Sequence, residues 1–163
     1  MKPFIPILVA AAGLGLHATP VAAGSSRSID VTTGQFVTLP GGVGLDLDVR
    51  GHAVMKRSDR DGGWTTVAVR ARGLRPNTTY PTHVHNQPCS WSPAGGSHYQ
   101  HVPGPPPAFV NPVNEMWPAI VTDDKGRGVG YAEHGHRARS DAQSIVVHEP
   151  TDTSIRIACL DLS

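Results

Sequence analysis

Short segments in which residues of alternating character point to opposite faces recur along the chain, separated by Gly, Pro, Asn and Asp. In WTTVAVRARGL, every second residue from Thr65 to Ala71 would face one side and every second residue from Trp64 to Arg70 the other, which is the period of a half-buried strand. No stretch has a long helical period. The segments that predict strands are residues 34–39, 44–49, 52–58, 64–74, 79–85, 119–124, 128–134, 144–149 and 153–162.

Two segments predict hairpin turns. SDRDGGW offers Asp61, Gly62 and Gly63 for positions with positive φ, and TDDKGRG (residues 122–128) has the same character. About eight strands with turns at this spacing predict an all-β fold. We expect an antiparallel Greek-key β-barrel or β-sandwich.

A long loop interrupts this rhythm. Residues 86–114 contain seven prolines and three glycines, and no run in them could join a sheet. Loops of this length in compact domains are usually functional or disordered. This one starts beside two histidines and carries SPAGGSHYQH, which holds two more, so we expect a functional loop.

The N-terminal residues 1–23 have the pattern of a secretory signal peptide, with Lys2, a short apolar run and Val-Ala-Ala before Gly24. A retained membrane anchor is disfavoured because His17 and Pro20 break the run, so we expect no stable membrane insertion. The remaining residues 24–163 suit one domain. We therefore predict a secreted, periplasmic or cell-envelope protein.

The charge balance argues against nucleic acid as a partner. Of 14 basic residues, Lys2 leaves with the signal peptide, and the other 13 match the 13 acidic residues. The sequence does not decide the oligomeric state, and a monomer is the expectation.

The two cysteines, Cys89 and Cys159, are an even number in a chain that is expected to be exported. We predict a disulfide between them that stabilises the fold by roughly 4 kcal/mol in the chain-entropy model. Two buried free thiols are the alternative.

Eight histidines follow the signal peptide, and some of their positions suggest a metal site. His83 and His85 in THVH would share one face of a strand, as a pair of ligands can. His98 follows two glycines, and His148 ends the buried run SIVV, although a lone histidine at a strand end is more often a packing residue. A cupin would need a glutamate where this chain has Cys89 and Ser90. His134 and His136 lie among charged residues and are expected to be solvated, with a weak exposed copper-loading site as the alternative, and His52 is expected on the surface of a strand.

Four motifs in order, THVHNQPCS, AGGSHYQH, SIVVHE and RIACL, resemble the copper/zinc superoxide dismutase family over roughly residues 64–162. The resemblance implies that His83, His85, His98 and His148 bind copper. It also implies that Arg156 receives the anionic substrate, superoxide, and that His98 loosens and takes a proton during turnover. Imidazole ligands suit copper in both oxidation states.

The loop HVPGPPPAFVNPVNEMW departs from the family because the histidines that hold zinc are missing, and His101 alone cannot replace them. The pattern is similar to the copper-only branch, in which a glutamate holds the histidine that would otherwise bridge to zinc. This implies a role for Glu115 beside His98, and no bound zinc. Asp152 matches a family aspartate that links the two metal sites.

The resemblance therefore implies an exported copper-dependent superoxide dismutase. The alternative is a secreted copper-binding domain of the same fold with little turnover, which would serve in metal scavenging or recognition. A Cys/His hydrolase is disfavoured because the cysteines are better explained as a disulfide.

Overall fold

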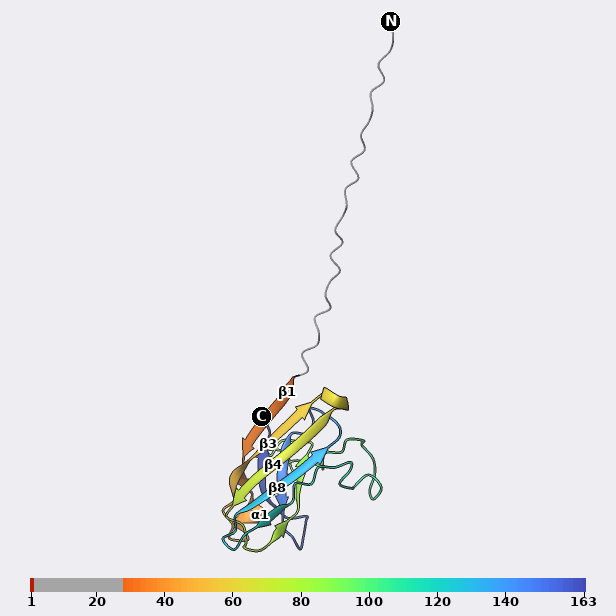
Figure 1. Ribbon diagram of the computed structural model, residues 1–163. Coiled ribbons are helices and arrows are strands. Elements are labelled where there is room, and N and C mark those ends of the chain that lie inside the picture. Colours follow the sequence, from red (N-terminus) through yellow and green to blue (C-terminus); the bar gives the residue numbers. More distant parts are fainter. Residues whose placement is uncertain (2–27) are drawn as a thin grey trace.

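The computed structural model describes Met1 and residues 28–163 (Figure 1). The predicted signal peptide, apart from Met1, lies outside the described residues. Within these residues, one short helix, α1 (Pro40–Val43), and one 3-10 turn, η1 (Arg60–Gly62), accompany ten strands. The strands are β1 (Ile29–Gln35), β2 (Val37–Thr38), β3 (Arg50–Ser58), β4 (Trp64–Arg72), β5 (Thr79–Tyr80), β6 (Thr82–His85), β7 (Ile120–Thr122), β8 (Gly128–His134), β9 (Ser144–His148) and β10 (Arg156–Asp161).

The strands form two antiparallel sheets. One has the order β1-β3-β4-β8-β7-β5 and the other the order β2-β10-β9-β6. Apolar side chains such as Val67 on β4 and Val147 on β9 are buried in the core between them. The all-β prediction is confirmed, in its β-sandwich form.

Both predicted turns are present. Asp61, Gly62 and Gly63 have φ of 53°, 89° and 95°, so the chain uses all three positions with positive φ to turn from β3 into β4. Gly126 has φ of 68° between β7 and β8.

The strand predicted at residues 44–49 is wrong. This segment is a turn after α1, in which Asp46 has φ of 57° and interrupts the extended backbone. Leu45 and Leu47 alternate with polar residues because they pack against the core, and no ladder forms. The structure also contains β1, most of which the sequence pattern did not predict.

The outer face of the four-stranded sheet is covered by a loop, and several of the histidines lie between the sheet and this loop. Residues directly opposite each other in antiparallel strands have side chains on the same face. His83 lies opposite Val146, and Arg156 lies opposite His148, so these side chains share the face that points away from the core. All five residues of β9 are buried although only alternate ones face the core. The segment between β6 and β7 accounts for this burial.

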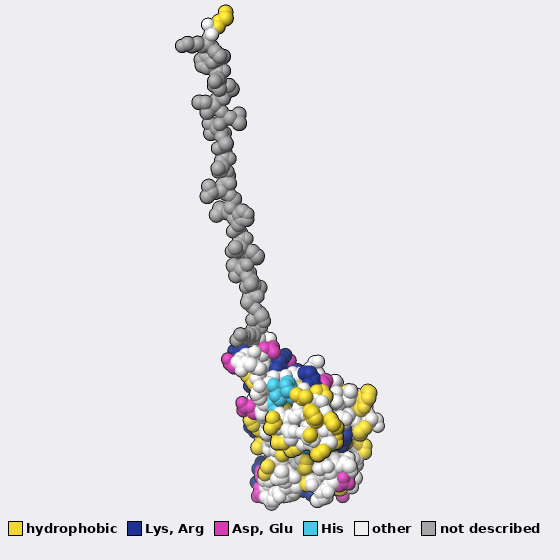
Figure 2. Space-filling view, turned by 90° about the vertical axis from the view of Figure 1, so that its right-hand side faces the viewer, with side chains coloured by type: hydrophobic (Ala, Val, Ile, Leu, Met, Phe, Trp, Pro, Cys, Tyr) yellow, Lys and Arg dark blue, Asp and Glu magenta, His cyan; other side chains and the backbone are white. Residues whose placement is uncertain are grey.

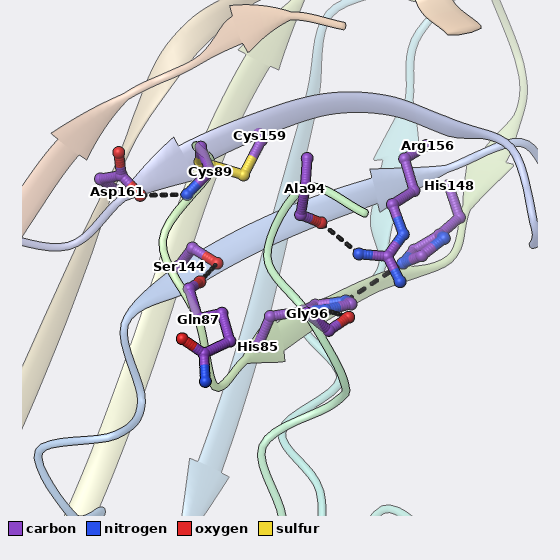
Figure 3. Close-up of a disulfide and its surroundings, with 10 residues drawn as sticks. All are labelled: His85, Gln87, Cys89, Ala94, Gly96, Ser144, His148, Arg156, Cys159 and Asp161. Carbon is purple, nitrogen blue, oxygen red and sulfur yellow. Dashed lines mark hydrogen bonds between the residues drawn. A yellow bond between two sulfur atoms is a disulfide. The ribbon is translucent and has the colours of Figure 1, made fainter. Parts of the chain in front are cut away.

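That segment, residues 86–119, returns across the sheet and forms isolated bridges between His85 and His98 and between Gln100 and Glu115. It is held at its start by the predicted disulfide, since Cys89 is bonded to Cys159 of β10 with their Cα atoms 5.7 Å apart. The bond confirms the pairing (Figure 3) and fits an extracellular or periplasmic location, where disulfides persist. Among the described residues, no helix has the length and apolar character needed to cross a membrane.

Replacement of both cysteines, Cys89→Ser with Cys159→Ser, should lower the free energy of unfolding by about 4 kcal/mol, because the bond closes a loop of 70 residues. Urea denaturation of the metal-free protein measures the difference. Ser92→Ala, an exposed position in the same loop, serves as the control and should leave stability unchanged. A loss below about 1 kcal/mol in the double variant would mean that the loop stays closed without the bond.

Candidate metal centre

The structure brings four histidines together. His83 and His85 come from β6, His148 from the end of β9 and His98 from the covering loop. One nitrogen of each lies within 4.8 Å of the corresponding nitrogen of every other, so the group could hold a metal ion. The two histidines predicted to share a strand face do so, and the two others converge on them.

Backbone carbonyls set the orientation of two of these rings. Nδ1 of His85 donates to the Gly96 carbonyl at 3.2 Å, and Nδ1 of His148 donates to the Thr153 carbonyl at 2.6 Å. A carbonyl can only accept, so the proton of each neutral ring is on Nδ1 and each Nε2 carries a lone pair. The two Nε2 atoms face each other at 3.3 Å, with no proton between them in the neutral state. Facing lone pairs of this kind suit a cation.

His98 and His83 complete the donor set. Nδ1 of His98 lies 2.8 Å from Oε2 of Glu115, which leaves its Nε2 available. Nδ1 of His83 is buried and has no hydrogen-bond partner in the structure. A buried nitrogen without a partner is costly, and a metal ion at this position would satisfy it. The four residues therefore fit a metal ion bound through imidazole nitrogens alone.

Gly95 and Gly96 allow the loop to approach the sheet. Both have positive φ, of 83° and 67°, which disfavours other residues. A Cβ on Gly95 would lie 2.7 Å from a methyl group of Val146, and one on Gly96 would lie 2.5 Å from the side chain of Gln87. The glycine pair thus brings the Gly96 carbonyl within reach of His85.

Burial keeps the ligand histidines neutral. It lowers the pKa of His83 to about 3 and that of His85 to about 2, and the nearby His98 and His148 act in the same direction. Burial also lowers the pKa of His148 to about 4, although its hydrogen bond to Thr153 opposes the shift. Neutral imidazole is the form that binds metals.

Arg156 lies beside the cluster and also holds the loop. Its NH1 group donates to the carbonyl of Ala94, and its guanidinium points toward His148 (Figure 3). Its positive charge lowers the pKa of both His85 and His148. The arginine that was predicted to receive an anion is therefore close enough to affect the site electrostatically.

Asp152 is not brought to the histidines. Its carboxylate accepts hydrogen bonds from the amide and hydroxyl of Ser154, and its side chain is exposed. It stabilises the turn between β9 and β10, and this turn presents the Thr153 carbonyl to His148. The expected link from Asp152 to a metal site is replaced by a backbone contact.

Glu115 has two further partners that the sequence reasoning did not identify. Gln100 donates to its Oε1 at 3.0 Å and Trp117 donates to its Oε2 at 2.9 Å. Trp117 follows Glu115 by two residues, a spacing that would place both side chains on one side of an extended segment. This spacing is the only signal in the sequence for their contact.

Two other histidines differ from expectation. His134 is buried and His136 is half-buried, whereas both were expected to be solvated. The reason is that the covering loop places His101 against them, with the His101 and His136 rings stacked 3.5 Å apart. Figure 2 shows this loop-covered face, where a group of histidine side chains reaches the surface beside hydrophobic ones. His52 is exposed, as predicted.

No protein-family model matches the chain, and a search of curated proteins finds no significantly similar sequence. The function of the chain must therefore be inferred from the geometry of its own site.

The metal-free protein should lose stability as the pH falls from 7 to 5. The lowered pKa values of His83, His85 and His148 mean that the unfolded chain, with histidine pKa near 6.5, binds more protons in this range. The free energy of unfolding is then greatest above pH 6.5. At pH 5, each imidazole that stays neutral in the folded protein lowers this free energy by about 2 kcal/mol relative to its value above pH 6.5. Urea denaturation at both pH values measures the change.

A His148→Gln variant is the control for this measurement, because it removes one of the buried titrating groups and should reduce the pH dependence. Equal stability of the metal-free protein at pH 7 and pH 5 would contradict the assigned pKa shifts.

Proposed function

We propose that the chain is an exported, copper-dependent superoxide dismutase that converts superoxide into O2 and H2O2. The observation that carries this proposal is the guanidinium of Arg156 beside four converging imidazoles. A positive charge next to a cation site weakens metal binding, and the hydrogen bond by which Arg156 holds the loop needs a donor but no charge. Neither metal binding nor loop attachment therefore accounts for a cation at this place. An anionic substrate that approaches the metal does give a reason, and it also accounts for the resemblance seen in the sequence.

The donor set supports copper. It consists of imidazole nitrogens with no thiolate or carboxylate, and imidazole ligands suit copper among the transition metals. Copper, when bound, would alternate between Cu(II) and Cu(I), so that one superoxide is oxidised to O2 and a second is reduced to H2O2 with two protons. His83, His85 and His148 would hold the metal, two of them in tautomers set by backbone carbonyls.

His98 is the residue suited to move a proton. Its Nδ1 stays bonded to Glu115, so Nε2 is the atom at which the ring can gain and release a proton. The half-exposed position of His98 gives solvent access to resupply that proton, whereas His85 and His148 are buried. The second proton would come from water.

A single metal is part of the proposal. In a site with two metals, Nδ1 of the bridging histidine would bind the second ion. Here Nδ1 of His98 contacts the Glu115 carboxylate, and the carboxylate accepts two more hydrogen bonds. We therefore propose the copper-only form, in which Glu115, in place of a zinc ion, orients the ring of His98.

The test uses residues 24–163 after separate loading with copper, zinc and both. The metal content of each sample is measured, and its superoxide dismutation is followed by pulse radiolysis. We expect one copper, no tightly bound zinc, and rapid turnover. Copper bound stoichiometrically without turnover would favour the copper-binding domain, and the absence of tight copper binding would exclude both.

Ligand variants make the same test specific to the site. His148→Ala removes a donor and should weaken copper binding by more than about 100-fold, the upper range for residues that only support a ligand. His52→Ala, at an exposed histidine outside the cluster, should bind copper as the wild type does.

Arg156→Ala should leave copper bound, because the Cys89–Cys159 bond still attaches the loop. It should lower the rate constant for superoxide by roughly tenfold at low ionic strength, because a cation at the mouth of the site attracts the anion. The difference should shrink as salt is added. Arg156→Lys, which keeps the charge, should lose less, and Arg70→Ala, at an exposed arginine of β4, is the control. An unchanged rate in Arg156→Ala at low salt would contradict the proposal that Arg156 attracts superoxide to the site.

A further inference from the structure

Glu115 is a buried carboxylate with an unusual number of fixed partners. Only 1% of its surface is exposed, and three donors contact its two oxygens. Oε1 accepts from Gln100, and Oε2 is shared by Trp117 and His98. A buried carboxylate requires such partners, since each unsatisfied oxygen would be costly.

The direction of two of these hydrogen bonds follows from the chemistry of the donors. The indole N–H of Trp117 can only donate, so Oε2 of Glu115 must accept from it. The amide N–H of Gly104 can also only donate, and it contacts Gln100 at 3.0 Å. The oxygen of the Gln100 amide must therefore face Gly104, and its NH2 group must face Oε1 of Glu115. Both carboxylate oxygens are thus held as acceptors by groups that cannot reverse.

The third partner, His98, is the one whose role can reverse. An imidazole can donate from Nδ1 or accept there, depending on its tautomer. We propose that Trp117 and Gln100 are positioning residues that act through Glu115 to keep the proton of His98 on Nδ1. The Nε2 lone pair of His98 then stays directed at the other three histidines, ready for a metal ion. The inference rests on the proposed function only in taking His98 as a metal ligand.

Trp117 also contacts the site from a second side. Its ring lies edge-on to His83, with the ring centroids 5.7 Å apart. One side chain therefore packs against one ligand histidine and, through Glu115, orients another. Replacing it with phenylalanine keeps most of the packing and removes only the N–H donor, so the two contributions can be separated.

The experiment reads the His98 tautomer directly in the metal-free protein, by long-range ¹H–¹⁵N NMR of histidine-labelled samples at pH 8. In the wild type, His98 should carry its proton on Nδ1. In Trp117→Phe and in Gln100→Met, the ratio of the Nδ1–H to the Nε2–H tautomer should fall by about fivefold, the factor that corresponds to one neutral hydrogen bond. Glu115→Gln should shift the ratio further.

Trp91→Phe is the matched control, since Trp91 is exposed and lies in the same loop. It should leave the tautomer unchanged. Gln100→Met acts through the other carboxylate oxygen, so it tests the inference even if Trp117→Phe does not fold. An unchanged His98 tautomer in the folded variants would overturn the inference.

Cu(II) binding, followed by electron paramagnetic resonance, supplies the second readout. Trp117→Phe should weaken Cu(II) binding by about tenfold and alter the spectrum, as loss of a residue that supports a ligand typically does. A tautomer shift together with no dismutation by the wild type would retain the inference and reject the proposed enzyme. Wild-type tautomer and Cu(II) spectrum in Trp117→Phe would reject the inference and leave the enzyme untouched.

Discussion

The attachment of the proline-rich loop to the outer face of the four-stranded sheet is the constraint on which the rest of the site depends. The sheet supplies three of the four histidines on one face, and the turn after β9 orients one of them, His148, through the Thr153 carbonyl. The loop adds His98 and also the Gly96 carbonyl that fixes His85. Two of its attachments are made to β10: the Cys89–Cys159 bond and the contact of Arg156 with Ala94 (Figure 3).

The orientation of the imidazoles is set by acceptors of different kinds. Two rings donate to backbone carbonyls, and one donates to a carboxylate. Carbonyl groups of the backbone cannot be changed by substitution of a side chain, so His85 and His148 are held by the fold itself. His98 is held by Glu115, a side chain supported by other side chains, which makes this ligand the most adjustable of the four.

Much of the fold and one pair of the clustered histidines could be predicted from local patterns, and the remainder could not for physical reasons. Period-two alternation placed His83 and His85 on one face, and the Asp61-Gly62-Gly63 turn was evident from its residue types. Residues 44–49 alternate as a strand does, yet backbone geometry at Asp46 prevents one. Alternation records which side chains are buried and does not by itself report a ladder of hydrogen bonds.

The partners of Glu115 and the position of Asp152 depend on how the covering loop folds back, which no local period encodes. Gln100 and Glu115 are fifteen residues apart and meet through an isolated bridge and a side-chain hydrogen bond. Asp152 matches a motif by its distance from His148, but the short turn satisfies its carboxylate locally. Local spacing therefore indicated that His83 and His85 share a face, and tertiary contacts decided which groups support the cluster.

The disulfide has a consequence for the order in which the protein matures. A reduced chain would carry the same histidines on β6 and β9 but would lack the covalent tie that holds the start of the loop against β10. The Gly96 carbonyl and His98 would then reach their places less often, and the donors would be gathered only part of the time. If the histidines bind a metal as proposed, oxidation of the two thiols would favour full assembly of the site, and the reduced chain would bind the metal more weakly.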